Sequence, residues 1–157
     1  MLNIMKGEEG MSVIKKSIVI DRPVEKVYKL GTDPAKWHEW YVGLSEPEDM
    51  LGNGETGTKM TLKYKILGVD LPISCEIVEN TEKGDCYVWK GIIKGAINSR
   101  QTWTYVPEEE STEVMIDIEY EVPGNILGKL ADILVVEKIQ DNAMEETLKN
   151  LKANCEA

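Results

Sequence analysis

The stretch INSRQTWTYVPEEESTEVMIDIEYEV, residues 97–122, decides the fold. Apolar and polar side chains alternate on both sides of a loop that holds one proline and three glutamates. Such alternation is typical of strands with one face in the core and the other in water. We therefore predict two antiparallel strands, 97–106 and 112–122, joined by a solvated loop. The side chains expected to point into the core are Ile97, Ser99, Gln101, Trp103, Tyr105, Val114, Ile116, Ile118, Tyr120 and Val122.

Working outward, the segments before this hairpin show the same period of two. Residues 58–67, 71–80 and 85–94 predict three further strands, which makes a five-stranded antiparallel meander. A turn at 81–84 would place Cys75 opposite Lys90 and Asn80 opposite Asp85. The β-branched run 13–20 predicts a first strand, and 44–51 a short edge strand whose acidic residues and proline discourage further pairing.

Helices are expected in three places. Asp21 and Pro23 mark the start of a short helix over 24–30, and Asp33 and Pro34 the start of a second over 34–41. One long helix is expected from about 125 to 154, covering the apolar face of the sheet. Its apolar stripe comprises Leu127, Leu130, Ala131, Leu134, Ile139, Ala143, Met144, Leu148, Leu151 and Cys155.

The length of 157 residues predicts one domain, 12–157, preceded by a loose leader, 1–11. Hydrophobic residues make up 42% of the chain and charged residues 29%, which is typical of a globular protein. The net charge of −10 argues against binding to a nucleic-acid backbone, which needs surplus Lys and Arg. We expect no nucleic-acid partner.

The residue inventory excludes several chemistries. His38 is the single histidine, and the three cysteines form no CxxC pair, so we expect no metal site and no cofactor. A small and odd number of cysteines is typical of proteins whose thiols stay free in a reducing compartment. We find neither a signal-peptide pattern nor an apolar run long enough to span a membrane. A cytoplasmic location is therefore expected.

The order of these elements resembles the helix-grip, START-like superfamily, which includes the birch-pollen-allergen fold and polyketide cyclase/dehydrase-like proteins. The residues that carry the resemblance are 18–28, Asp33-Pro34 with Trp37 and Trp40, and the segments 103–107, 113–122 and 128–156. The resemblance implies an α+β fold. A curved seven-stranded antiparallel sheet grips the long C-terminal helix, with two short helices after the first strand. It also implies a cavity that binds lipids, polyketides or other apolar molecules. A minority of the superfamily's members are enzymes, and some are co-chaperones.

Inward-facing aromatic side chains support such a cavity, because small-molecule sites are mostly apolar with a few polar anchors. The same aromatics could instead simply fill the core. Charged substitutions at Trp103 or Leu134 are expected to abolish ligand binding. The side chains expected to contact a ligand are Met60, Leu62, Tyr64, Ile73, Cys75, Tyr87, Trp89, Gln101, Trp103, Ile118, Tyr120, Leu127, Leu130 and Leu134.

Other reactive residues carry weaker signals, and we assign no catalytic residue. His38 is interpreted as a surface imidazole, and Cys75 and Cys86 as small core residues. Strict alternation places Arg100 on the outer face, unless a bulge turns it into the cavity. The alternation of the first strand places Lys16 on the inward face. We expect its long side chain to reach solvent at an open end of the sheet.

We therefore expect a protein that binds an apolar or aromatic small molecule between sheet and helix. One alternative is a cyclase or dehydratase acting on a polyketide-like substrate in the same cavity, which would need an acid/base pair there. A second alternative is a protein–protein adaptor or co-chaperone-like factor. It would use the acidic outer face or the region of Trp37 and Trp40, so a protein partner stays open.

Overall fold

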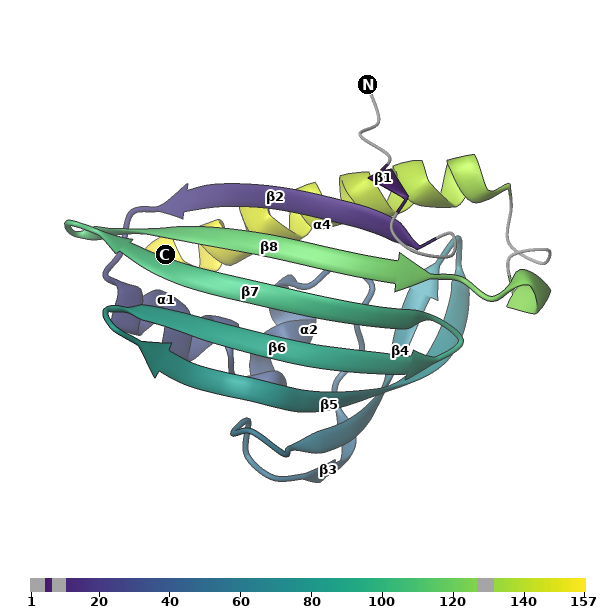
Figure 1. Ribbon diagram of the computed structural model, residues 1–157, viewed down its shortest axis with the longest axis horizontal. Coiled ribbons are helices and arrows are strands. Elements are labelled where there is room, and N and C mark those ends of the chain that lie inside the picture. The colour runs from purple at the N-terminus through teal and green to yellow at the C-terminus, as the bar shows by residue number, and fades with distance from the viewer. Residues whose placement is uncertain (1–4, 7–10, 127–131) are drawn as a thin grey trace.

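A curved antiparallel sheet holds a long C-terminal helix against its inner face in the computed structural model (Figure 1). The structure describes residues 5–6, 11–126 and 132–157. The strands are β1 (Met5–Lys6), β2 (Ser12–Ile20), β3 (Glu48–Leu51), β4 (Lys59–Ile66), β5 (Val69–Lys83), β6 (Cys86–Gly95), β7 (Asn98–Glu108) and β8 (Ser111–Glu121). The helices are α1 (Val24–Gly31), the 3-10 turn η2 (Pro34–Lys36), α2 (Trp37–Trp40) and α4 (Ile133–Glu156).

The strand order is β1-β2-β8-β7-β6-β5-β4-β3, and every described pairing is antiparallel. The expected meander from β4 to β8 is confirmed, and the first long strand joins it beside β8. Figure 1 shows α1, α2 and α4 together on one side of the sheet. The predicted seven-stranded sheet, long helix and two short helical segments are thus present, with the two-residue β1 added from the expected leader.

Burial follows the predicted alternation. In β4 exposed and buried side chains alternate along all eight residues. In β8 every side chain of the inward set is buried. Because a strand turns successive side chains to opposite faces, this one periodicity fills the concave side with apolar and aromatic groups. Arg100 lies on the outer face, where its guanidinium is 3.3 Å from the Glu119 carboxylate.

The β5–β6 hairpin differs from the expected register. The turn is two residues, Gly84 and Asp85, so Cys75 lies opposite Ile93 rather than Lys90. Gly84 has φ +67°, a conformation that two-residue hairpin turns require and glycine adopts freely. A register shift between Ile77 and Glu79 changes the pairing again.

Two side chains near α2 and β2 also differ from expectation. His38 is half-buried rather than fully on the surface, since its Nδ1 is buried and its Nε2 lies 3.4 Å from the Glu46 carboxylate. Lys16 does not end free in solvent, since its Nζ lies 3.2 Å from the Asp141 carboxylate. The edge strand is shorter than expected, with only an isolated bridge at Leu44 before Glu48.

The long helix begins later than expected, at Ile133, after a helical stretch at 124–126. Leu127 and Leu130 fall outside the described residues. Leu134 is 61% exposed, so the prediction that it faces the cavity is wrong. The buried side of α4 runs through Val136, Gln140 and Met144, at the spacing of one helix face. Leu134 precedes Val136 by two residues, which turns it about 200° away.

Polar contacts fix the C-terminal end of α4 to the first strand and its following loop. The Glu156 carboxylate accepts a hydrogen bond from the Asp21 amide at 2.8 Å. The Arg22 guanidinium donates to the Glu156 carbonyl at 2.6 Å. Nearer the other end, the Lys16–Asp141 ion pair joins β2 to α4. The helix is therefore fastened along the sheet at two separate points.

Candidate functional site

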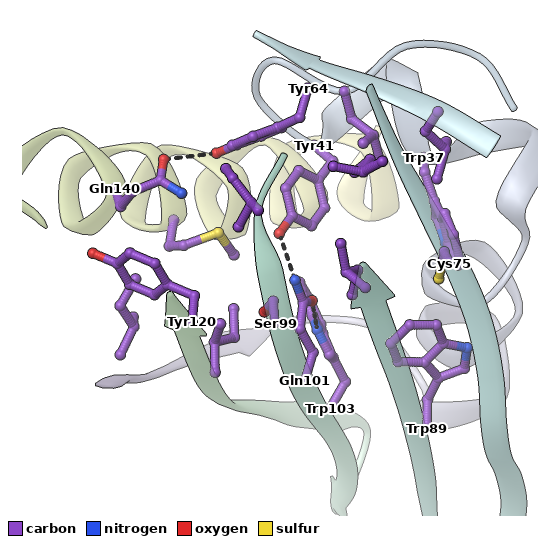
Figure 2. A pocket seen from close by; sticks show the side chains of 18 of the residues that line it. Trp37, Tyr41, Tyr64, Cys75, Trp89, Ser99, Gln101, Trp103, Tyr120 and Gln140 are labelled. Carbon is purple, nitrogen blue, oxygen red and sulfur yellow. Dashed lines mark hydrogen bonds between the residues drawn. The ribbon is translucent and has the colours of Figure 1, made fainter. Parts of the chain in front are cut away.

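A cavity lies between the concave face of the sheet and the helices (Figure 2). About 800 Å³ of space is left free of atoms there, counted with its opening to solvent. Its lining comprises Ile14, Gly31, Trp37, Trp40, Tyr41, Leu44, Leu62, Tyr64, Ile73, Cys75, Trp89, Ile93, Ile97, Ser99, Gln101, Trp103, Tyr105, Ile118, Tyr120, Gln140 and Met144.

Aromatic rings dominate the walls, and all four tryptophans of the chain line the cavity. The short helix α2 turns Trp37 and Trp40 to the same side, where each meets a tryptophan of the sheet. Trp37 packs edge-on against Trp89 with ring centroids 5.4 Å apart, and Trp40 against Trp103 at 5.7 Å. Edge-to-face packing of this kind holds the rings in fixed orientations.

A chain of hydrogen bonds crosses the cavity wall. The Trp103 indole donates to Gln101 Oε1 at 2.9 Å, and Gln101 Nε2 donates to the Tyr41 hydroxyl oxygen at 3.1 Å. Figure 2 shows Gln101 between these two rings. Since Tyr41 accepts in this contact, its own hydroxyl hydrogen stays available to a third group. Burial raises the pKa of Tyr41 above the ordinary value of 10.0, so the phenol stays protonated at neutral pH.

A second polar contact joins the sheet to α4. The Tyr64 hydroxyl donates to Gln140 Oε1 at 2.9 Å, as the dashed line in Figure 2 shows. Burial raises the pKa of Tyr64 to about 12, although the bond to Gln140 acts in the opposite direction. This contact fixes one end of the cavity by tying the helix to β4.

Three buried polar atoms in the lining have no hydrogen-bond partner among the described residues: Trp40 Nε1, Trp89 Nε1 and Ser99 Oγ. A buried polar group without a partner costs about 1–3 kcal/mol. Two of the three are indole N–H groups, which only donate. Residues that line the cavity therefore carry hydrogen-bond donors that the described part of the protein leaves unpaired.

No Asp, Glu, Lys, Arg or His is found among the described side chains of the lining. Burial raises the pKa of the Cys75 thiol to about 12, with Glu76 adding to the rise, so the thiolate needed for nucleophilic attack is scarce at neutral pH.

In the described parts of the chain, no three His, Cys, Asp or Glu side chains come together as metal ligands. Those parts also contain no helix long and apolar enough to cross a membrane.

The cavity brings together nine of the fourteen side chains expected to contact a ligand: Leu62, Tyr64, Ile73, Cys75, Trp89, Gln101, Trp103, Ile118 and Tyr120. That any of them binds a ligand stays a prediction. Met60 is buried in the core without lining the cavity. Tyr87 is also outside the lining, because its ring stacks on Tyr28 of α1 with centroids 4.1 Å apart.

Several lining residues were not among the candidates. The alternation predicts that Ser99 points inward, but it does not distinguish a ligand contact from a core position. Tyr41 lies at the end of the predicted helix over 34–41 and is not singled out there. Gln140 was missed because a search for apolar residues passes over a polar side chain on the inward face of a helix. The signal that finds it is its spacing from Val136 and Met144, four residues on either side.

Comparisons with known proteins agree with this architecture. A crystal structure of the Zhui aromatase/cyclase from Streptomyces sp. R1128 superposes with a TM-score of 0.76 at 12% identity, covering 93% of this chain and 94% of that one. A START superfamily protein from Mycobacterium smegmatis gives a TM-score of 0.74 at 16% identity, with coverage of 94% and 98%. A norcoclaurine synthase point mutant from Thalictrum gives 0.58 at 14% identity, with coverage of 94% and 97%.

These similarities establish the fold alone, because all three identities are low. A search of the curated proteins finds no match. The family model described as polyketide cyclase / dehydrase and lipid transport matches residues 11–156. This match spans nearly the whole chain and includes every strand from β2 to β8 and the helix α4. The chain therefore belongs to the polyketide cyclase / dehydrase and lipid transport family.

Proposed function

We propose that this protein binds a planar, largely apolar small molecule that carries a neutral hydrogen-bond acceptor, such as a ketone oxygen. The observation that carries the proposal is an aromatic cavity without charged lining residues among those described, in which several lining residues carry unpaired hydrogen-bond donors. An acceptor on the ligand would satisfy donors that the protein leaves unpaired. Family membership supports the same class of apolar ligand.

The chemistry of the lining favours a neutral acceptor over an anion. A carboxylate or phosphate gives up hydration when it is buried and needs a cationic partner in return. The described lining holds no such cation. A ketone or ether oxygen loses less hydration when it is buried. The Tyr41 hydroxyl or a tryptophan N–H can replace the hydrogen bond that this oxygen made with water. Burial of the apolar part adds about 25 cal/mol per Å² before ordering costs.

A fluorescence titration with the neutral aromatic ketone prodan tests this proposal. Because all four tryptophans line the cavity, a bound ketone should quench their emission and shift its own emission to shorter wavelength. We expect saturation at one molecule per chain. Ser99→Ile should weaken binding by about tenfold or more, since the larger side chain fills the cavity.

The matched control is Ser74→Ile, which makes the same change on the exposed face of β5 and should leave the affinity unchanged. Leu134→Asp should also bind normally, because Leu134 points away from the cavity. Unsaturable quenching would contradict the proposal. Equal affinity of Ser99→Ile and the wild type would do so as well.

A second candidate function is a cyclase or dehydratase that acts on a carbonyl-bearing substrate in the same cavity. The hydrogen-bond chain from Trp103 through Gln101 to Tyr41 favours it, because a positioned hydroxyl could stabilise negative charge developing on a carbonyl oxygen. Deuterium exchange at the methyl group of acetylnaphthalene, followed by NMR, tests it. Wild-type acceleration that Tyr41→Phe abolishes would support catalysis, and exchange no faster than in buffer would count against it.

A further inference from the structure

A buried carboxylate lies on the face of α4 that meets the cavity. Glu137 is only 4% exposed. It precedes Gln140 by three residues and Met144 by seven, the spacing of one helix face. Gln140 and Met144 both line the cavity, and Glu137, which is outside the lining, continues the same stripe by one turn toward the start of the helix. The sequence analysis did not single this residue out.

The Glu137 carboxylate is not neutralised by any described part of the protein. Its Oε1 is buried without a hydrogen-bond partner among the described residues. No Lys, Arg or His nitrogen of those residues lies within 4.0 Å of its oxygens, by the ion pairs found. Lys16, which faces α4 from β2, is already paired with Asp141 at 3.2 Å. Among the described residues, the Glu137 carboxylate therefore has no cationic partner.

Tyr120 of β8 marks one end of the cavity. Tyr120 lines the cavity at the end where Gln140 lies, as Figure 2 shows. Burial raises the pKa of the Tyr120 phenol above its ordinary value, Ser12 lowers it by hydrogen bonding, and the charges of Glu137 and Asp141 raise it again. Glu137 and Gln140 lie one turn apart on the same face of α4, which places the Glu137 carboxylate toward this end of the cavity.

An unpaired buried carboxylate is costly, and a bound cation removes much of that cost. We infer that Glu137 forms a subsite for a protonated amine of the ligand, at the end of the cavity bounded by Gln140 and Tyr120. This inference rests on the proposed function. It adds a cationic group to a ligand that already has an aromatic body and a neutral hydrogen-bond acceptor. Gln140 and Tyr120 offer further oxygens that could accept hydrogen bonds from an ammonium.

Two probes of nearly equal shape test the subsite: naphthylmethylamine, which is protonated at neutral pH, and naphthalenemethanol, which is neutral. Tryptophan quenching and calorimetry give both affinities. We expect the wild type to prefer the amine by about tenfold, the usual gain for a hydrogen bond to a charged group. Glu137→Gln should remove this preference and leave the affinity for the alcohol unchanged.

The control variant is Glu146→Gln, which removes the same charge from an exposed position on α4 and should keep the preference. Equal wild-type affinities for the two probes would overturn the inference, as would a preference that survives in Glu137→Gln. The wild-type comparison needs no variant and stays decisive if Glu137→Gln does not fold. Binding of neither probe would contradict the proposed function itself.

Discussion

Replacing Gln101 with leucine probes the hydrogen-bond chain at the centre of the cavity wall. The side chain keeps a similar size, but its two hydrogen bonds disappear. Trp103 is only 3% exposed, so its indole N–H cannot turn to bulk water for a new partner. Tyr41 loses the donor that positions its hydroxyl. The perturbation therefore acts on both rings that Gln101 connects.

The magnitude follows from these contacts. Leaving the buried Trp103 donor unpaired costs about 1–3 kcal/mol, and losing the neutral bond to Tyr41 costs about 0.5–1.5 kcal/mol. The leucine recovers about 1 kcal/mol through burial of apolar surface. We expect Gln101→Leu to lower the free energy of unfolding by about 2 kcal/mol. For a chain of this size the melting temperature should fall by about 4–8 °C.

Urea unfolding followed by circular dichroism measures this change without depending on tryptophan emission. A double-mutant cycle with Trp103→Phe isolates the contact, because phenylalanine carries no donor to leave unpaired. The coupling free energy should be about 1 kcal/mol or more. Arg100→Leu on the exposed face of the same strand is the control, with a change of about 0.5 kcal/mol or less. Additivity within about 0.5 kcal/mol in the cycle would refute this reasoning.

Two further predictions concern cavity size and the fastening of α4. A methyl group added at Gly91 would collide with the Trp89 ring, so Gly91→Ala should push that ring into the cavity and weaken prodan binding about tenfold; an unchanged titration would contradict this. The hydrogen bond from Lys152 and that from the Asp21 amide lower the pKa of Glu156 below its ordinary 4.5. This carboxylate therefore stabilises the fold above its unfolded pKa and loses that effect as the pH falls through its folded pKa. The difference in melting temperature between wild type and Glu156→Gln should be constant from about pH 8 to about pH 6 and shrink below about pH 4.5, whereas a difference unchanged at low pH would argue against this role.

The inner face of the sheet could be predicted from sequence because its signal is local. Each strand alternates with period two, and burial in β4 and β8 repeats that alternation residue by residue. The register of β5 against β6 could not be predicted in the same way. It depends on a two-residue turn at Gly84 and a shift near Ile77, neither of which alters the apolar pattern.

The inward face of the long helix could not be predicted from its apolar pattern. Extending one apolar stripe from residue 127 through Leu134 assumed a continuous helix, and the later start of α4 changes which residues face inward. The polar residues Glu137 and Gln140 occupy inward positions that a hydrophobic pattern assigns to the surface. The apolar pattern therefore passes over the two polar side chains that this face of the helix carries beside the cavity.

The indole region of a nitrogen–proton correlation spectrum tests the central claim most directly. The four tryptophans should give four indole signals, and the cavity contains all of them. With prodan added, the account predicts saturable shifts that are largest for Trp40 and Trp89, whose N–H groups are unpaired among the described residues. Trp37, which donates to the Gly31 carbonyl at 2.9 Å, should shift less. Backbone shifts confined to the outer face of the sheet, with all four indole signals unmoved, would contradict a ligand site inside the cavity.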